Sequence, residues 1–131
     1  MKKILLLMVA AMLISTSVFA MPQKGDDGIS YWDGDMNYPI WDSGSHGGSC
    51  IDLSSAVLKT DNASECRIEM LDFSVNYDTD SISPIGIVQF REDKGSGRIY
   101  FKTENSKWGW QKFGFSSRTE VYYLVKEKVV N

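Results

Sequence analysis

The amino-acid sequence predicts an α+β fold, in which a small antiparallel sheet of about five strands carries one C-terminal helix packed on it. Three observations predict this fold. Residues 50–113 alternate apolar and polar side chains between clusters of turn residues. Residues 117–129 combine a helix-start signal with apolar side chains at helical spacing. Residues 1–20 have the pattern of a cleaved signal peptide, so the folded body begins after them.

The signal peptide is indicated by the order of its parts. Lys2 and Lys3 precede an apolar run at 4–14, which polar residues separate from Val18-Phe19-Ala20. The run holds 11 residues, whereas a helix that spans a membrane needs about 20. We predict cleavage after Ala20, a secreted or periplasmic location, and no membrane contact by the mature chain, residues 21–131.

The balance of charges narrows the classes of partner. The chain has 14 Lys plus Arg against 17 Asp plus Glu, and without the first 20 residues 12 bases face 17 acids. An acidic surface disfavours nucleic acid as a partner. One histidine and two cysteines offer little for a metal cage or a catalytic triad. We expect no metal, no cofactor and no enzymatic activity, although carboxylate-only glycoside hydrolysis stays open because acids are plentiful.

Residues 21–49 show no apolar period and are rich in glycine, with aromatic residues interleaved. Such a segment predicts an extended N-terminal arm pinned by its aromatic side chains, with room for a short strand at 29–32. The domain proper is then a single antiparallel β unit with its C-terminal helix, over residues 50–131.

The strands of that unit follow from alternation and turn chemistry. The second strand changes phase, because its apolar residues lie first at even positions (Ile68, Met70) and then at odd ones (Phe73, Val75). An inserted residue produces such a change, so we expect a β-bulge near residues 71–72. The predicted strands are 50–59, 66–77, 85–92, 98–103 and 108–113.

The final segment fits a helix better than a sixth strand. Ser117 and Glu120 have the spacing of a capping box, and Val121, Leu124 and Val125 share one helical face. The strand alternative remains because Val121, Tyr123 and Val125 occupy every second position, as on one face of a strand.

Four segments resemble a loose group of small uncharacterised secreted bacterial proteins. The matching segments are a DLSS strand, an aromatic hairpin, a short Trp strand and a helix similar to EMAFYLAYG, at 52–55, 97–101, 108–110 and 120–125. The resemblance implies a sheet with a C-terminal helix and bacterial export, and it assigns no catalytic residue. The chain departs from the group by carrying Cys50 and Cys66.

An even pair of cysteines in an exported chain predicts a disulfide between Cys50 and Cys66. Geometry opposes it, because a plain hairpin of strands 50–59 and 66–77 would place Cys50 opposite residue 73. Either the bridge exists and the strands are not a simple hairpin, or the cysteines pair otherwise; a reactive thiol is the lesser alternative.

Two groups of residues are candidates for binding. The first is the loop at 43–49, where Ser45, His46, Gly47 and Gly48 could plug the cleft of an enzyme. Its plainer interpretation is a solvated histidine in a flexible loop, and a nucleophilic pair of His46 with a cysteine would lack its orienting group.

The second candidate is a sugar-stacking platform made by Trp108 and Trp110, although tryptophans in so small a domain are more often packing residues. Because both lie on one face of the predicted strand 108–113, we expect them to be both exposed or both buried.

The export signal, the lack of a catalytic constellation and the Gly/aromatic arm predict an exported, non-enzymatic binding protein. Within that class we expect an inhibitor or immunity-type protein that acts on an envelope enzyme through 43–49. The alternative is a glycan- or peptidoglycan-binding module that uses Trp108 and Trp110. The partner would be an extracytoplasmic protein or a cell-envelope glycan.

Overall fold

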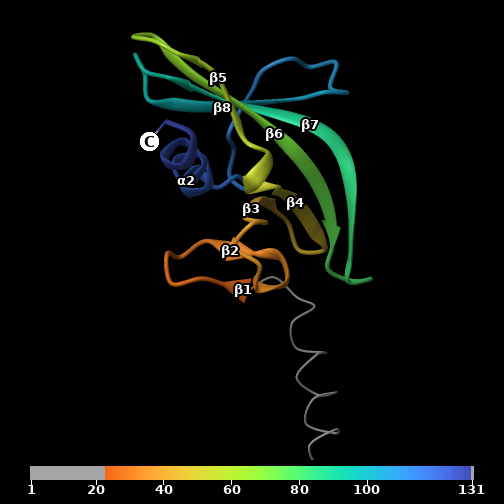
Figure 1. Ribbon diagram of the computed structural model, residues 1–131. Coiled ribbons are helices and arrows are strands. Elements are labelled where there is room, and N and C mark those ends of the chain that lie inside the picture. The colour runs from red at the N-terminus through yellow and green to blue at the C-terminus, as the bar shows by residue number, and fades with distance from the viewer. Residues whose placement is uncertain (1–22, 131) are drawn as a thin grey trace, which may run out of the picture.

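The computed structural model describes residues 23–130, and the predicted signal peptide lies outside this range. The predicted class is confirmed: antiparallel strands dominate the described residues, and a C-terminal helix packs on them (Figure 1). The elements are β1 (Gln23–Lys24), β2 (Ser30–Tyr31), η1 (Trp32–Gly34), β3 (Ile40–Ser43), β4 (Gly47–Ile51), η2 (Leu53–Ser55), β5 (Val57–Asp61), β6 (Glu65–Asn76), β7 (Ser81–Asp93), β8 (Arg98–Thr103), β9 (Gln111–Lys112) and α2 (Thr119–Val130).

The main sheet has seven strands within residues 23–130, two more than expected, in the order β3-β4-β6-β7-β8-β9 with β5 also paired to β6. The long strand β6 takes two partners on one edge: β4 lies against its second half and β5 against its first. In Figure 1 the long strands β6 and β7 curve strongly, and α2 lies on the concave side of the sheet. The sheet therefore has an inner face toward the helix and an outer face away from it.

The last part of the N-terminal arm, from Ile40 on, belongs to this sheet, which corrects the boundary at residue 50, whereas β1 and β2 pair with each other in a separate two-stranded sheet. Strand β4 begins at Gly47, so that boundary falls inside a strand, and β3 pairs with β4 as a hairpin. The predicted strand 50–59 is two strands separated by η2. The Asp52 carboxylate accepts a hydrogen bond from the Ser54 amide at 3.0 Å, which turns the backbone away from the extended path there.

The inner core is aromatic and its centre comes from the arm. Trp41 of β3 is 3% exposed and packs against Phe90 of β7, Phe101 of β8 and Phe113, with ring centroids 5.0 to 5.7 Å apart. Helix α2 covers this core with the buried side chains of Val121, Tyr122 and Val125. The arm thus supplies a central residue of the core that alternation alone does not reveal.

A second, smaller cluster explains the phase change in β6. Trp32, Ile40, Cys50 and Val75 pack together apart from the inner core. Because Val75 points to the opposite face from Ile68, the two halves of β6 bury opposite faces of the sheet.

The prediction of a bulge in β6 is therefore wrong, because the extra residue lies in the neighbouring strand β7. The register changes from Asp72↔Gly86 to Phe73↔Pro84, so the unmatched residue is Ile85 of β7.

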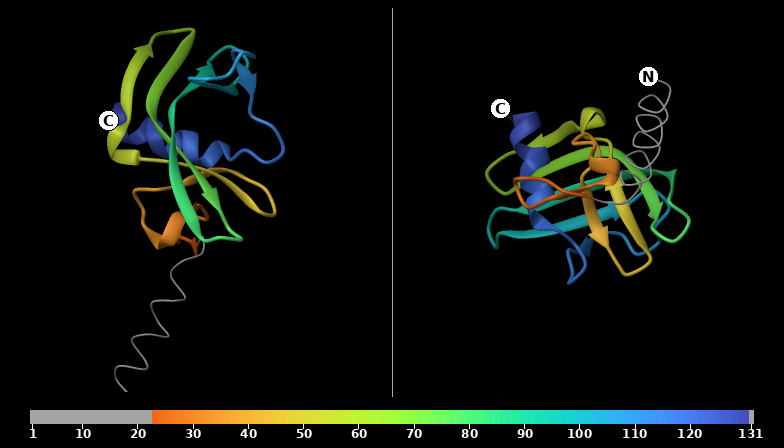
Figure 2. Two further views of the ribbon diagram at one scale, coloured as in Figure 1. Left: turned by 90° about the vertical axis from the view of Figure 1, so that its right-hand side faces the viewer. Right: turned by 90° about the horizontal axis from the view of Figure 1, so that it is seen from below.

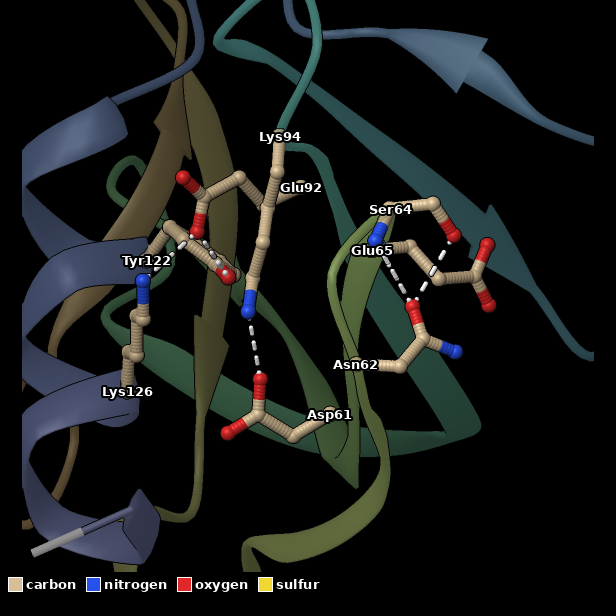
Figure 3. A network of polar contacts seen from close by, with 8 residues as sticks. All are labelled: Asp61, Asn62, Ser64, Glu65, Glu92, Lys94, Tyr122 and Lys126. Carbon is tan, nitrogen blue, oxygen red and sulfur yellow. Dashed lines mark hydrogen bonds and ion pairs between the residues drawn. The ribbon is translucent and has the colours of Figure 1, made fainter.

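The predicted helix is confirmed at Thr119–Val130, one residue after the start that a Ser117 N-cap implies. Figure 3 shows how it is fixed to the sheet: Glu92 of β7 accepts hydrogen bonds from the Tyr122 hydroxyl at 2.9 Å and from Lys126 Nζ at 2.8 Å. Beside it, Lys94 Nζ donates to Asp61 at 2.7 Å and joins the β7–β8 turn to β5. No helix among residues 23–130 is long and apolar enough to cross a bilayer.

Candidate functional site

The two tryptophans of the predicted platform do not share a strand face. Strand β9 begins at Gln111, so Trp108 and Trp110 lie in the preceding loop, and Gly109 between them has a positive φ of 69°. This turn separates their environments: Trp108 is 75% exposed, whereas Trp110 is half-buried. The expectation that both would be buried or both exposed is wrong, because glycine breaks the alternation on which it depended.

Trp110 lies among cations on the outer face of the sheet. The guanidinium carbons of Arg67 and Arg91 are 5.9 and 5.2 Å from the centroid of its ring, and Lys102 Nζ is 6.0 Å away. Arg91 also lies 4.8 Å from the ring of Tyr100. We call Arg67, Arg91, Tyr100, Lys102 and Trp110 the Trp110 cluster. The distances are those of cation–π contacts, which attract each cation to the ring.

Strand register explains how the cluster is assembled. Arg67 of β6 is directly opposite Arg91 of β7, which is directly opposite Tyr100 of β8. Residues directly opposite share a face, so the three side chains form one row across the outer face. Two arginines in opposing positions repel each other. The pair is tolerated here because both arginines contact the ring of Trp110 and the carboxylate of Glu65.

The carboxylate of Glu65 serves both arginines. Its Oε1 accepts a hydrogen bond from Arg67 Nη2 at 2.8 Å, and its Oε2 lies 3.6 Å from Arg91 Nη1. The adjacent Arg67, first, and then Arg91 hold the pKa of Glu65 below its usual value, so it is charged at neutral pH. Glu65 thus faces the two guanidinium groups, whereas Lys102 lines one pocket together with the carboxylates of Glu69 and Glu104.

The Nε atoms of Arg67 and Arg91 are buried and have no hydrogen-bond partner among residues 23–130. Buried donors are usually paired, and a lone one needs a local reason. At the tip of the adjoining loop, Lys107 Nζ lies 5.6 Å from the Trp108 ring. The outer face thus combines cations with a fixed indole, and the adjoining β8–β9 loop carries an exposed indole.

The predicted loop at 43–49 is the β3–β4 hairpin, with an exposed turn at Gly44, Ser45 and His46. Figure 2 shows this hairpin beside the end of the β6–β7 hairpin, and two contacts join them. The Tyr77 amide donates to the His46 carbonyl at 2.9 Å, and His46 Nδ1 lies 2.9 Å from Asp78 Oδ2. Both side chains of the second contact are largely exposed, so that pair contributes little to stability.

Gly47 and Gly48 are fixed by packing. A Cβ on Gly47 would overlap the carbonyl oxygen of Val75, and one on Gly48 would overlap the carbonyl oxygen of Asp42. These glycines allow strand backbones to approach closely, and only Ser45 and His46 of the predicted loop residues are free to meet a partner. The hairpin is a strand-bound turn and not a flexible loop.

The predicted disulfide is absent. Cys50 and Cys66 are free, buried thiols, and each belongs to a different core cluster. Cys50 is directly opposite Phe73, seven positions along β6 from Cys66, a separation of roughly 20 Å along the strand. Burial, and then the nearby Asp72, raise the pKa of the Cys50 thiol to about 12, so neither a thiolate nor a pair with the exposed His46 forms at neutral pH.

Asp72 is a buried carboxyl group that sequence reasoning passed over. It is 2% exposed, and its Oδ1 accepts a hydrogen bond from Trp41 Nε1 at 3.0 Å. Burial raises the pKa of Asp72 to about 6, although the Trp41 contact opposes the shift. Its even position in β6 placed it on the buried face together with Ile68 and Met70, and that pattern is the signal that could have found it.

No metal-binding group of three or more His, Cys, Asp or Glu side chains occurs within residues 23–130. No family model, curated protein or solved structure matches this chain.

Proposed function

We propose that the chain is an exported, non-enzymatic binding protein and that its outer sheet face binds an acidic glycan of the cell envelope. The observation that carries the proposal is the Trp110 cluster, in which three cations surround one indole on the outer face of the sheet. The predicted export signal and the net negative charge of the mature chain supply the context: three cations that gather around one ring on such a chain favour an anionic ligand there.

The chemistry of an acidic glycan matches the cations of the outer face and the exposed indole of the adjoining loop. Sugars present apolar faces that stack on exposed indoles, and Trp108 offers such a ring with Lys107 beside it. Carboxylates of the glycan would pair with the guanidinium groups of Arg67 and Arg91 and with Lys102, whose geometry is already held by Trp110. Preorganised side chains lose little entropy on binding.

Variants of single side chains test this proposal. Purified mature protein is titrated with acidic muropeptides from peptidoglycan and binding is followed by calorimetry. Trp108→Ala and Lys102→Gln are each expected to weaken binding by about five- to tenfold, since an exposed stacking or ionic contact contributes about 1 kcal/mol. Both residues are exposed, so the fold should persist.

Lys24→Gln is the matched control, because it removes one exposed positive charge from β1, outside the Trp110 cluster. Its affinity should equal that of the unchanged protein. If the Lys24 variant loses as much affinity as the Lys102 variant, binding depends on overall charge, and the assignment to the Trp110 cluster is wrong.

A second candidate function is the inhibitor or immunity role through the β3–β4 hairpin. It is favoured by a specific observation: the exposed Ser45-His46 turn is rigidly mounted by Gly47 and Gly48. Bulky substitutions at those glycines would damage the sheet, so the test uses the tip instead. Ser45→Arg should abolish capture of an envelope enzyme by the mature protein while Lys24→Gln retains it; equal capture by both variants would refute the role.

A further inference from the structure

A separate cleft lies on the same outer face, at the other end of the sheet. It has a volume of about 310 Å³, and its walls include the rings of Trp32, Tyr38 and Phe73. The rings support one another: Tyr38 packs edge-to-face on Phe73 with centroids 5.9 Å apart, and Trp32 stacks on Tyr77 at 6.4 Å. These contacts tie the cleft to the second core cluster, so its aromatic walls are held in place.

Two carboxylates line the same cleft. Asp33 lies within η1, and Asp35 directly follows its last residue. Both are exposed. Neither forms an ion pair with any described residue, and within residues 23–130 the Asp35 carboxylate accepts a hydrogen bond from the Asn37 amide at 2.9 Å. The negative charge of this cleft is therefore uncompensated within residues 23–130.

The backbone places the first carboxylate at some cost. Asp33 has a left-handed conformation with φ 58°, followed by Gly34 with φ 68°. A non-glycine residue in this region is uncommon and is energetically unfavourable. Two consecutive left-handed residues fold η1 tightly, which sets Asp33 and Asp35 on either side of one turn beside the aromatic walls.

We propose that this cleft binds a small organic cation carrying a quaternary ammonium group. Aromatic rings attract such a cation through their negative faces, and they do so without requiring hydrogen-bond donors from it. The two unpaired carboxylates add Coulomb attraction at the rim. A neutral ligand of the same shape would gain the apolar contact alone, and an anion would be repelled.

The charge and shape of the ligand can be separated in one experiment. Choline and its neutral carbon isostere, 3,3-dimethyl-1-butanol, are titrated into the mature protein and followed by calorimetry and by NMR shifts of the indole protons. Choline is expected to bind at least about tenfold more tightly than the isostere. Equal affinities, or no binding of choline up to about 50 mM, would overturn the proposal.

Conservative variants assign the binding to the cleft. Asp33→Asn and Asp35→Asn keep the side-chain shape and remove one charge each, and each is expected to weaken choline binding by about three- to tenfold. Asp80→Asn is the matched control, because Asp80 is an exposed aspartate that also has a positive φ, 54°, in the β6–β7 turn. Unchanged affinity in the Asp33/Asp35 double variant, or an equal loss in the Asp80 variant, would contradict the site.

Discussion

The carboxylate of Asp72 accepts a hydrogen bond from Trp41 Nε1 at 3.0 Å in the interior of the sheet. The contact joins the central strand β6 to the N-terminal strand β3 across the aromatic core. It satisfies an indole donor that would otherwise be buried without a partner. It also places a titratable group in a position where its charge is costly.

Asp72 should make the protein less stable as the pH rises through 6. Burial raises the pKa of Asp72 in the folded state to about 6 from an ordinary value of 3.8, so its stabilising contribution is complete below pH 4 and is lost as the folded carboxyl ionises. Asp72→Asn keeps an acceptor for Trp41 and removes the charge. We expect this variant to be more stable than the unchanged protein at pH 7.5, by on the order of 2 kcal/mol, and about equally stable at pH 4.

Urea unfolding of both proteins at several pH values between 4 and 7.5 measures this difference. A stability difference that is constant across the range would show that the Asp72 carboxyl does not titrate there.

Gly48 should not tolerate alanine, whereas Gly44 should. A Cβ on Gly48 would overlap the Asp42 carbonyl oxygen, but one on Gly44 would lie 3.6 Å from the Gly47 carbonyl oxygen, an ordinary contact. Thermal unfolding should show a loss of about 3 kcal/mol or more for Gly48→Ala and a change below about 0.5 kcal/mol for Gly44→Ala. Similar midpoints for the two variants would mean that β3 and β4 are not packed as closely as described.

Glu92→Ala should cost more stability than Tyr122→Phe. The first change leaves the Tyr122 hydroxyl and the Lys126 ammonium without their shared acceptor, whereas the second removes one hydrogen bond. We expect losses of about 2 and about 1 kcal/mol, respectively, in the free energy of unfolding. Glu127→Ala, at an exposed position on α2, is the control and should be neutral. The reverse order of the two losses would show that Glu92 does not hold the helix to β7.

Both cysteines should be reduced and unreactive in the folded protein. The thiols are buried, and burial raises the pKa of Cys50 to about 12, so a thiol reagent should label neither cysteine until urea is added and then label both. Intact mass under non-reducing conditions gives a second check, since a disulfide would lower it by about 2 Da. That lower mass, or labelling without urea, would contradict the separate burial of Cys50 and Cys66.

The parts of the fold that alternation and capping encode locally were predictable. The hairpin of β7 and β8 and the helix at 119–130 follow from turn residues, period-two alternation and 3.6-residue spacing. The arm was not predictable, because its strands are short and its glycines, such as Gly48, serve strand contacts that exist only in three dimensions. Likewise, the phase change in β6 reflects two cores on opposite faces, which a local pattern cannot distinguish from a bulge.

The candidate site was predictable in part. Trp110 was identified from its residue type, but its cationic neighbours Arg67 and Arg91 come from strands whose register no local pattern gives. The glycine between Trp108 and Trp110 could have warned that the two indoles need not share a face.

The proposed preference of the outer face for acidic glycans is tested most directly by comparing two forms of one ligand. Calorimetry measures the affinity of the mature protein for a muropeptide with free carboxylates and for the same muropeptide with those carboxylates amidated. The Trp110 cluster predicts that the free acid binds at least about tenfold more tightly and that added salt narrows the gap. Equal affinities for the two forms, or tighter binding of the amidated form, would contradict the account.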